Sequence, residues 1–326
     1  MSGLKGEAFW ITGRETGEIR SCAVPSPGDG EVLVRSLYSG ISRGTESLVF
    51  RGAVPPNQFE AMRAPHQEGD FPWPVKYGYC NVGLVEEGPP TLKGRSVFCL
   101  YPHQDRYVVP EAAVVPLPEN VPAGRAMLAA NMQTAVNGLW DGTPRVGDRI
   151  AVIGGGTVGC LLAFLAASIP GCSVQLIDID ADKAGLAADL GAAFTTPDKA
   201  AGEFDLLFHA SGQPEGLATA LELAGFEATI VELSWYGDQS VPLKLGESFH
   251  SKRLDLRSSQ VSHLPAAQRG RWTHRRRSAL ALSLLADDRL DQLITGESAF
   301  RDLPSVMQDL CRRPKGVLCH RISYAE

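Results

Sequence analysis

The stretch that decides the fold is Arg149-Ile-Ala-Val-Ile-Gly154-Gly155-Gly156-Thr157-Val158-Gly159. A short apolar run of strand type leads into a G-x-G-x-x-G loop, and the apolar segment VGCLLAFLAASI then predicts a helix. In such a loop Gly154 permits the tight turn, Gly156 lets the backbone approach a pyrophosphate, and Gly159 lets the helix pack on the strand. Because the phosphates then meet the positive end of the helix, we expect the loop, with Thr157 and Val158, to bind a dinucleotide.

An acid follows at the position that such a loop requires. The next strand ends at Asp178, about twenty residues after Gly159. A carboxylate there accepts hydrogen bonds from ribose hydroxyls and repels a 2′-phosphate, and no arginine follows between residues 179 and 182. These residues favour NAD(H) over NADP(H). The alternative, a glycine-rich turn with an ordinary surface acid, does not explain why strand, helix, second strand and acid agree.

The part of the chain that surrounds the glycine loop alternates between apolar runs and helical segments. From Asn131 the pieces are QTAVNGLW, SVQLIDID, DKAGLAADLGA, FDLLFHASG, EGLATALELA and EATIVEL. This alternation predicts buried parallel strands joined by crossover helices, which is a doubly wound sheet. Ser211 follows the strand FDLLF at the carboxyl edge of that sheet, where we expect it to flank the nicotinamide ribose.

The flanking segments have a different texture. Up to about Pro118 the chain consists of short alternating apolar runs separated by Pro and Gly clusters, which predicts a mostly antiparallel β-rich domain. After about Val261 two helical segments precede GVLCHRISY, a strand pattern that could return to the first domain. The expected organisation is therefore an α/β fold with a first domain over 1–120, a cofactor domain over 121–262 and a return over 263–326.

Composition narrows the functional class. The chain has 326 residues, of which 44% are hydrophobic and 21% charged, and its net charge of −6 argues against a protein devoted to nucleic acid or an anionic membrane. No apolar run is long enough to cross a membrane and the first residues lack a secretory core, so we expect a cytoplasmic protein. The seven cysteines are scattered without a C-x-x-C pair, which predicts reduced thiols rather than disulfides.

Five segments together resemble the medium-chain dehydrogenase/reductase superfamily: SGISRGTE (39–46), GYCNVGLV (78–85), NMQTA (131–135), the glycine loop, and HASG (209–212). The resemblance implies a GroES-like β-rich catalytic domain and a Rossmann cofactor domain. Within the superfamily, SGISRGTESLVFRG with GYCNVGLV looks most like the branch containing 2-desacetyl-2-hydroxyethyl bacteriochlorophyllide dehydrogenase, which oxidises a secondary hydroxyethyl group with NAD.

The departures from the superfamily pattern concern zinc. Where zinc alcohol dehydrogenases carry a Cys and a His-Glu pair, this chain has Ser42 and Tyr79-Cys80, and Ala130 lies near the place of another metal-binding residue. The four-Cys structural lobe is also missing. We therefore expect no zinc and a mechanism built on hydrogen-bond donors, with a substitute metal site from Glu46, Cys80 and His103 as the alternative.

Hydride transfer requires a group that holds and moves the hydroxyl proton. By resemblance Tyr79 points at the reacting centre, although it could equally be an aromatic packed under the nicotinamide. His103 is a candidate because imidazole is the usual acid–base group of enzymes, but a lone histidine is more often a structural hydrogen-bonder. Thr45 and Ser42 could relay a proton through their hydroxyls, while Glu46 is expected to fix the local turn.

Three further residues belong to the expected cofactor site through the resemblance. Arg43 and Lys315 would reach the pyrophosphate, with solvated surface charges as the alternative. Thr134 would pack against the nicotinamide.

A basic run, Arg269-Gly-Arg-Trp-Thr-His-Arg-Arg-Arg277, opposes the dipole of the helix that it begins. An anionic ligand or a carboxylate partner explains it better than solvation, and nucleic acid is the least favoured candidate. With the aromatic loop 51–77, this run would shape a large pocket, for which we expect Trp73, Trp272 and Arg275 as substrate contacts.

The sequence thus predicts a zinc-independent NAD(H)-dependent oxidoreductase that interconverts a secondary alcohol and a ketone, on a bulky planar or anionic substrate. The alternatives are a quinone or enoyl reductase, and a non-catalytic NAD(H)-binding sensor. By resemblance the chain forms a homodimer, with a small molecule as its only other partner.

Overall fold

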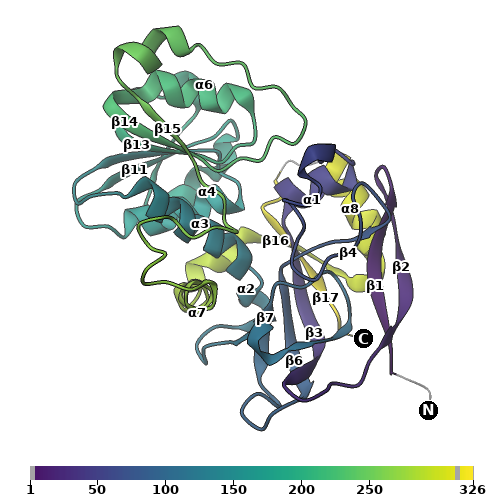
Figure 1. The fold of residues 1–326 in the computed structure, drawn as a ribbon. Helices are drawn as coiled ribbons and strands as arrows, with labels where there is room; N and C mark the ends of the chain where they lie inside the picture. Colours follow the sequence, from purple (N-terminus) through teal and green to yellow (C-terminus); the bar gives the residue numbers. More distant parts are fainter. Residues whose placement is uncertain (1–3, 313–315, 326) are drawn as a thin grey trace. The chain divides into compact units, whose positions relative to one another are not determined.

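The computed structural model describes residues 4–312 and 316–325, and the chain divides into two compact units. Unit 1 comprises residues 1–130 and 278–326, and unit 2 comprises residues 131–277 (Figure 1). The chain therefore leaves unit 1 once, builds unit 2, and returns.

Unit 1 is rich in antiparallel β-structure, as its alternating apolar runs predict. Its smaller sheet has the order β2-β1-β5-β4. Its larger sheet has the order β16-β17-β3-β6-β7-β9, and β8 also pairs with β3. The strands are β1 (Leu4–Gly13), β2 (Thr16–Val24), β3 (Glu31–Ile41), β4 (Glu68–Gly69), β5 (Val75–Lys76), β6 (Asn81–Glu87), β7 (Ser96–Cys99), β8 (Arg106–Pro110), β9 (Val114–Pro116), β16 (Ile294–Ala299) and β17 (Cys319–Ser323).

After unit 2 the chain returns to unit 1. Strand β17 pairs antiparallel with β3, with His320 opposite Ile41 and Ser323 opposite Tyr38. The two segments predicted as helices form α7 (His274–Leu284) and α8 (Leu303–Arg312). Unit 1 also carries α1 (Arg43–Phe50), directly after β3, and the short α2 (Ala123–Ala126).

Unit 2 is built on a six-stranded parallel sheet of order β12-β11-β10-β13-β14-β15, which confirms the doubly wound half (Figure 1). The chain winds outward from β10 in one direction and then in the other, so the topological switch point lies at the carboxyl end of β10. The strands are β10 (Arg149–Ile153), β11 (Ser173–Ile177), β12 (Ala193–Thr195), β13 (Phe204–His209), β14 (Ala224–Glu232) and β15 (Asp255–Ser258). The helices are α3 (Ala129–Gly142), which begins just before the boundary of unit 2, α4 (Thr157–Ala167), α5 (Ala184–Asp189) and α6 (Pro214–Leu223).

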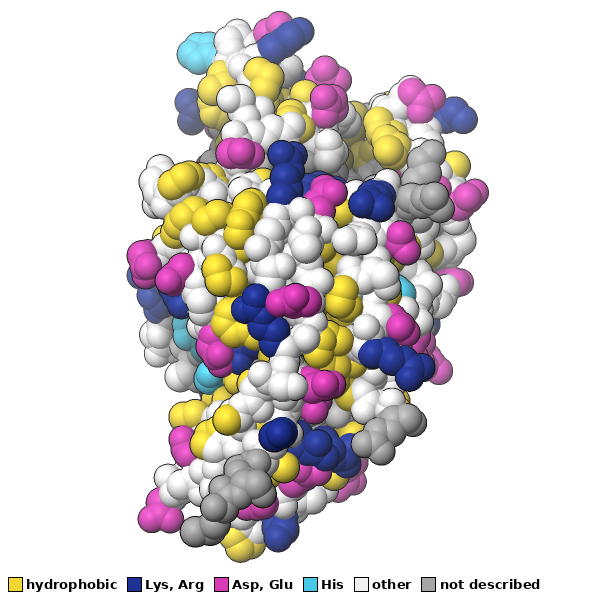
Figure 2. All heavy atoms as spheres, turned by 90° about the vertical axis from the view of Figure 1, so that its right-hand side faces the viewer, with side chains coloured by type: hydrophobic (Ala, Val, Ile, Leu, Met, Phe, Trp, Pro, Cys, Tyr) yellow, Lys and Arg dark blue, Asp and Glu magenta, His cyan; other side chains and the backbone are white. Residues whose placement is uncertain are grey.

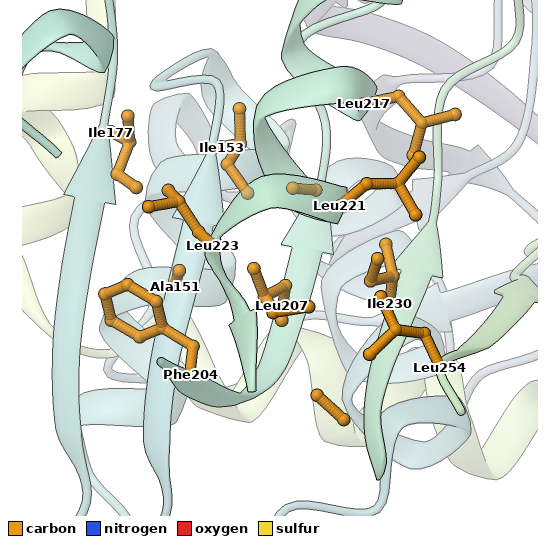
Figure 3. Close-up of a cluster of buried hydrophobic side chains, with 13 residues drawn as sticks. Ala151, Ile153, Ile177, Phe204, Leu207, Leu217, Leu221, Leu223, Ile230 and Leu254 are labelled. Atoms are coloured by element: carbon orange, nitrogen blue, oxygen red, sulfur yellow. The ribbon is translucent and has the colours of Figure 1, made fainter. Parts of the chain in front are cut away.

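Apolar side chains of consecutive parallel strands form the core beneath α6. Ile153, Leu207 and Ile230 come from neighbouring strands and lie with Leu217 and Leu221 of α6 in one buried cluster (Figure 3). Burying both faces of a parallel sheet explains why these strands read as continuous apolar runs. Packing within this cluster fixes the positions of β10 and β13, and hence the positions of the two loops that follow these strands.

The surface and the cysteines agree with the composition. On the face drawn in Figure 2, Lys and Arg side chains are interspersed with Asp and Glu. All seven cysteines are free thiols, and five of them are buried. Within residues 4–312 and 316–325, no helix is both long and apolar enough to cross a membrane.

Candidate functional site

The glycine loop has the geometry that its sequence predicts. Gly154 has a φ of +102°, and a Cβ there would lie 2.5 Å from the backbone nitrogen of Ser211. A Cβ on Gly159 would lie 1.8 Å from the carbonyl oxygen of Gly154, so the close approach of α4 to the loop requires glycine. At Gly156 a Cβ would meet nothing within 4 Å. The loop thus leaves open space beside the first turn of α4, which fits a dinucleotide phosphate.

Asp178 closes the loop from the end of β11. It is 9% exposed, its Oδ2 accepts a hydrogen bond of 2.6 Å from the Gly155 N–H, and its Oδ1 accepts one of 2.9 Å from the Asp180 N–H. Oδ2 keeps a lone pair, so the carboxylate can also accept a bond from a ribose hydroxyl. The residues at this edge of the sheet therefore fit a nicotinamide dinucleotide.

Lys183 is a site residue that sequence reasoning missed. Its Nζ lies 3.0 Å from Oδ1 of Asp178. Lys183 directly follows the 179–182 stretch, which contains no arginine. The only signal was a lysine about one helical turn further along, and it places a positive charge beside the carboxylate that was expected to repel a 2′-phosphate.

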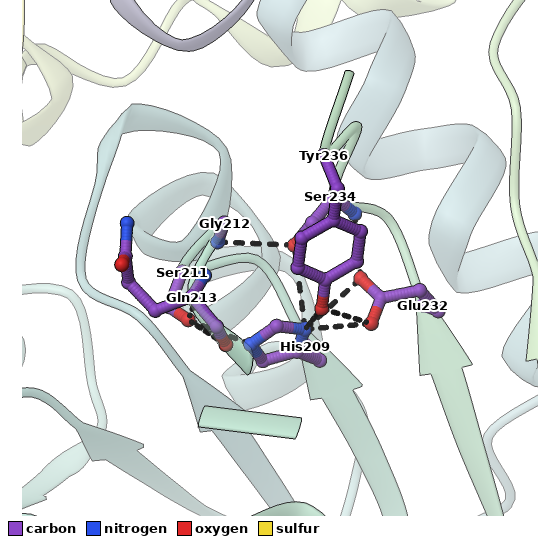
Figure 4. A network of polar contacts seen from close by, with 7 residues as sticks. All are labelled: His209, Ser211, Gly212, Gln213, Glu232, Ser234 and Tyr236. Carbon is purple, nitrogen blue, oxygen red and sulfur yellow. Dashed lines mark hydrogen bonds and ion pairs between the residues drawn. The ribbon is translucent and has the colours of Figure 1, made fainter. Parts of the chain in front are cut away.

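Ser211 belongs to a hydrogen-bonded network at the carboxyl ends of β13 and β14 (Figure 4). Its hydroxyl lies 2.6 Å from Nε2 of His209, whose Nδ1 lies 2.8 Å from Oε2 of Glu232. Tyr236 donates a hydrogen bond of 2.9 Å to the same Glu232 oxygen. The imidazole is completely buried, so the network holds Ser211 rigidly against Gly154.

A second polar cluster forms in unit 1 around His103, in the loop between β7 and β8. The imidazole is 1% exposed, and its Nε2 lies 2.8 Å from Oε2 of Glu46 on α1. Its Nδ1 lies 2.7 Å from the hydroxyl of Ser39 on β3. The other oxygen of Glu46 accepts a hydrogen bond of 2.7 Å from the N–H of Ser42, at the N-cap of α1. Glu46 therefore fixes the local turn, as expected, and also pairs with His103.

Tyr79 lies in the same cluster. A Cβ on Gly78 would lie 2.9 Å from Cδ2 of His103. Glycine at position 78 therefore lets the imidazole pack against the backbone directly before Tyr79. The side chain of Ser42 hydrogen-bonds Tyr79, and burial raises the pKa of the Tyr79 phenol well above its usual range. Burial likewise raises the pKa of the Cys80 thiol well above its usual range. Both groups are therefore neutral at physiological pH, and Tyr79 is available as a hydrogen-bond donor.

The aromatic loop continues this cluster outward. Ring centroids lie 5.8 Å apart for Phe59 and Phe71, 5.6 Å for Phe71 and Tyr77, and 6.0 Å for Tyr77 and Tyr79. We call this series the aromatic run. Trp73 packs separately against Gly52, where a Cβ would lie 2.1 Å from its ring. The aromatic run is thus a packed series of rings that ends at Tyr79, and its middle members, Phe71 and Tyr77, are buried.

The donor set of this cluster does not fit a zinc ion. The candidate ligands Glu46 and His103 bond directly to each other, and Glu46 is further bonded to the Ser42 N–H. In the described part of the chain, no three His, Cys, Asp or Glu side chains converge so that they could hold a metal. Ser42 and Tyr79 supply hydroxyls rather than the thiolate and imidazole ligands that zinc prefers.

The remaining candidate residues are distributed over both units. Thr45 is half-buried on α1, and Arg43 donates a hydrogen bond of 2.9 Å to the carbonyl of Val317. Thr134 is half-buried on α3, and Arg275 is exposed at the start of α7. Lys315 lies outside the described residues.

The basic run finds several of its partners locally. Arg276 stacks on Trp272 at 3.9 Å, and Trp272 in turn packs on Trp140 at 4.7 Å. Arg277 is 3% exposed and donates a hydrogen bond of 2.6 Å to Asn137, while nothing among the described residues accepts a bond from its Nε. Burial lowers the pKa of Arg277 to about 10. Trp272 is thus engaged within unit 2 by an indole and a guanidinium.

Comparisons with known proteins agree with this architecture. The chain is 32% identical to the D-xylulose reductase of Scheffersomyces stipitis over 127 residues, 39% of this chain and 33% of that protein. It is 26% identical to an uncharacterized zinc-type alcohol dehydrogenase-like protein of Haemophilus influenzae, over 64% of this chain and 61% of that protein. These two matches thus span less than two thirds of either relative. The D-guloside 3-dehydrogenase of Escherichia coli is 24% identical over 319 residues, 87% of this chain and 90% of that protein. No family model matches the chain.

Solved structures share the whole fold at low sequence identity. L-idonate 5-dehydrogenase from Escherichia coli superposes with a TM-score of 0.80 at 16% identity, over 98% of this chain and 99% of that chain. An alcohol dehydrogenase from Escherichia coli complexed with NADH has a TM-score of 0.78 at 18% identity, covering 99% of this chain and 100% of that one. A zinc-binding dehydrogenase from Sinorhizobium meliloti bound to NADP has a TM-score of 0.79 at 18% identity, covering 98% and 99%. The fold is that of the medium-chain dehydrogenases/reductases, as the sequence predicts.

Proposed function

We propose that this protein is an NAD(H)-dependent oxidoreductase that interconverts a secondary alcohol and a ketone without zinc. Its relatives are polyol and alcohol dehydrogenases, which supports alcohol–ketone chemistry. The glycine loop and Asp178 of unit 2 support the cofactor, and the polar cluster of unit 1 supports the handling of the substrate hydroxyl.

The observation that carries the proposal is the Glu46–His103 pair within the cluster that also holds Ser42 and Tyr79. It offers a buried carboxylate and a buried imidazole 2.8 Å apart, in place of a Lewis acid such as zinc. Two neutral hydroxyls, those of Ser42 and Tyr79, are hydrogen-bonded to each other. With Ser42 donating to it, the Tyr79 hydroxyl keeps its hydrogen for a substrate oxygen in either its alcohol or its carbonyl form.

The residues then divide the work as follows. The nicotinamide ring supplies or accepts the hydride when the cofactor is bound. Ser42 donates a hydrogen bond to the Tyr79 oxygen, and Tyr79 donates its own hydrogen to the substrate oxygen and so stabilises the negative charge that develops on it. The Glu46–His103 pair takes up the hydroxyl proton during oxidation and returns it during reduction.

The choice of NAD(H) rests on Asp178, whose carboxylate faces the loop from the end of β11. Two backbone N–H groups orient it, so it cannot rotate away from a ribose placed there. The ammonium of Lys183, 3.0 Å from it, balances part of its charge. We therefore propose a preference for NADH that depends on Asp178 and is moderated by Lys183.

The substrate that fits the cluster is bulky and at least partly planar. The aromatic run ends in two half-buried rings, Phe59 and Tyr79, whose exposed parts offer apolar surface to a planar substrate, while Phe71 and Tyr77 between them are buried. This supports the branch that the sequence resembles, in which a secondary hydroxyethyl group on a tetrapyrrole is oxidised. The cations of the basic run support carboxylate groups on the substrate.

A panel assay tests the function directly. Protein purified without chelators is incubated with NAD⁺ and secondary alcohols, from short diols and sugar alcohols to a hydroxyethyl-substituted tetrapyrrole, and NADH formation is followed by absorbance. We expect oxidation of the large planar alcohol with NAD⁺. Tight NADH binding without turnover of any alcohol, or reduction of quinones and enones instead, contradicts the proposal.

A further inference from the structure

We propose that four side chains of unit 1, Glu46, His103, Ser39 and Tyr324, form a proton path between the candidate active site and a hollow lined by Tyr324. We call this series the proton path. That the path serves alcohol oxidation rests on the proposed function, while the path itself is a property of unit 1.

The proton path is continuous. Oε2 of Glu46 lies 2.8 Å from Nε2 of His103, Nδ1 of His103 lies 2.7 Å from the Ser39 hydroxyl, and that hydroxyl lies 3.0 Å from the hydroxyl of Tyr324. Glu46, His103 and Ser39 are 3%, 1% and 1% exposed. All three separations are hydrogen-bond distances, so no water is needed to bridge them.

Every member of the path can both give and receive a hydrogen, which is the requirement for transfer by successive hops. When Nε2 of His103 carries the hydrogen, it donates to Glu46, Nδ1 accepts from Ser39, and Ser39 accepts from Tyr324. Shifting each hydrogen one place inward protonates Glu46, and Tyr324 regains a hydrogen from water. The reverse shift starts from protonated Glu46 with the His103 hydrogen on Nδ1, and it delivers one proton to water. Each shift leaves the imidazole in its other tautomer, so the hydrogens return to their starting places before the next proton crosses. One proton crosses in either case, and each internal group ends with the number of hydrogens it had at the start.

Tyr324, the outermost member of the path, is one of the residues that line a hollow of about 590 Å³ in unit 1. Charged side chains form part of its wall, among them Arg35, Asp105 and Arg301. A space of this size and polarity accommodates water. The ring of Tyr324 stacks on Phe300 at 4.7 Å, which fixes its hydroxyl toward Ser39.

Groups beside the path do not compete for the proton. Burial, together with the nearby carboxylates of Asp105 and Glu46, raises the pKa of Tyr324, which keeps its phenol protonated and able to donate. Of the groups facing Glu46, the thiols of Cys80 and Cys319 and the phenol of Tyr77 all have a pKa raised by burial, to about 12 for Cys319. These groups remain neutral, so near neutral pH protons move through the imidazole and the carboxylate.

The first test needs no substrate. The protein holds seven histidines, and ¹⁵N-histidine labelling makes the ring N–H of His103 observable by NMR, assigned by its loss in His103→Gln. The exchange rate of this hydrogen with water is measured in the wild type, in Tyr324→Phe and in Ser39→Ala. The matched control is Tyr107→Phe, because Tyr107 is a buried phenol of unit 1 that hydrogen-bonds Asn81 outside the path.

We expect exchange to slow severalfold in Tyr324→Phe and Ser39→Ala and to stay unchanged in Tyr107→Phe. A purely structural role for Tyr324 predicts the opposite sign, because loosening the packing accelerates exchange. Unchanged or faster exchange in both path variants overturns the proposal.

The second test uses turnover of the alcohol identified in the panel assay. Tyr324→Phe should lower kcat about tenfold, a part of the usual contribution of proton transfer, and increase the solvent deuterium isotope effect on kcat. KM and NADH affinity should not change. A fall in kcat without a larger isotope effect contradicts the path. If no alcohol is oxidised, the proposed function fails, and the exchange measurement still decides whether the path exists.

Discussion

The carboxylate of Glu46 lies 2.8 Å from Nε2 of His103, and both side chains are at most 3% exposed. One residue belongs to the first turn of α1 and the other to the loop between β7 and β8. Their pairing brings a carboxylate and an imidazole into the cluster that contains Tyr79.

Replacing Glu46 by alanine should destabilise the protein strongly. The change leaves the buried His103 ring and the Ser42 N–H without their partner, and breaking a buried pair costs about 3–5 kcal/mol. Urea unfolding followed by circular dichroism measures the loss. Glu86→Ala, which removes a carboxylate that pairs with Arg35 at partial exposure, is the control and should cost about 0–1 kcal/mol. Equal losses for the two variants would show that burial does not determine the cost.

Tyr79→Phe should lower kcat about a hundredfold or more, because the ring remains and the hydroxyl that holds the substrate oxygen is lost. Thermal unfolding should change little. Tyr77→Phe is the matched control, since it removes a hydroxyl from the neighbouring ring of the aromatic run and should keep nearly full activity. Full activity in Tyr79→Phe would assign that ring to packing under the nicotinamide instead.

Two glycines of the loop should separate binding from folding. Gly156→Ala meets no protein atom and should fold normally, but its methyl group occupies the space assigned to a phosphate, so NADH affinity should fall. Gly159→Ala forces a Cβ to 1.8 Å from a carbonyl oxygen, so it should destabilise unit 2 itself. Fluorescence titration with NADH and thermal unfolding of both variants check the contrast. Unaltered NADH binding in Gly156→Ala would show that no phosphate of the cofactor binds at this loop.

Asp178→Ala should weaken NADH binding about tenfold or more, the loss expected for charge-assisted hydrogen bonds. The ammonium of Lys183, freed from its partner, should then favour NADPH. Lys183→Met in the wild-type background should raise the preference for NADH, because it removes the cation beside the 2′ position. Titration of NADH and NADPH into the wild type and both variants measures this preference. Equal affinities of the wild type for NADH and NADPH would contradict the role given to Asp178.

Local motifs account for what could be predicted from the sequence. The roles of Gly154 and Gly159 and the place of Asp178 follow from a single strand–loop–helix unit, so the spacing alone carries them. The return of GVLCHRISY to β3 was also predictable, because a strand pattern at the end of a chain needs a sheet to join.

Pairs formed by distant segments could not be predicted. His103 and Glu46 are 57 residues apart, and Ser39 and Tyr324 are 285 apart, so no local spacing reveals their contact. Within its own segment, none of these residues indicates its distant partner. Glu46, for example, is explained there as an acid that fixes the local turn. The fold of unit 1 alone brings them together. Lys183 is different, because it follows Asp178 closely in the same segment and a local pattern could therefore reveal it.

The most direct test of the account is the zinc content and NAD⁺-dependent turnover of one sample purified without chelators. The account predicts that elemental analysis finds far less than one zinc per chain, and that alcohol oxidation survives dialysis against a strong chelator. About one zinc per chain, with activity that is lost on chelation and restored by zinc, would contradict it.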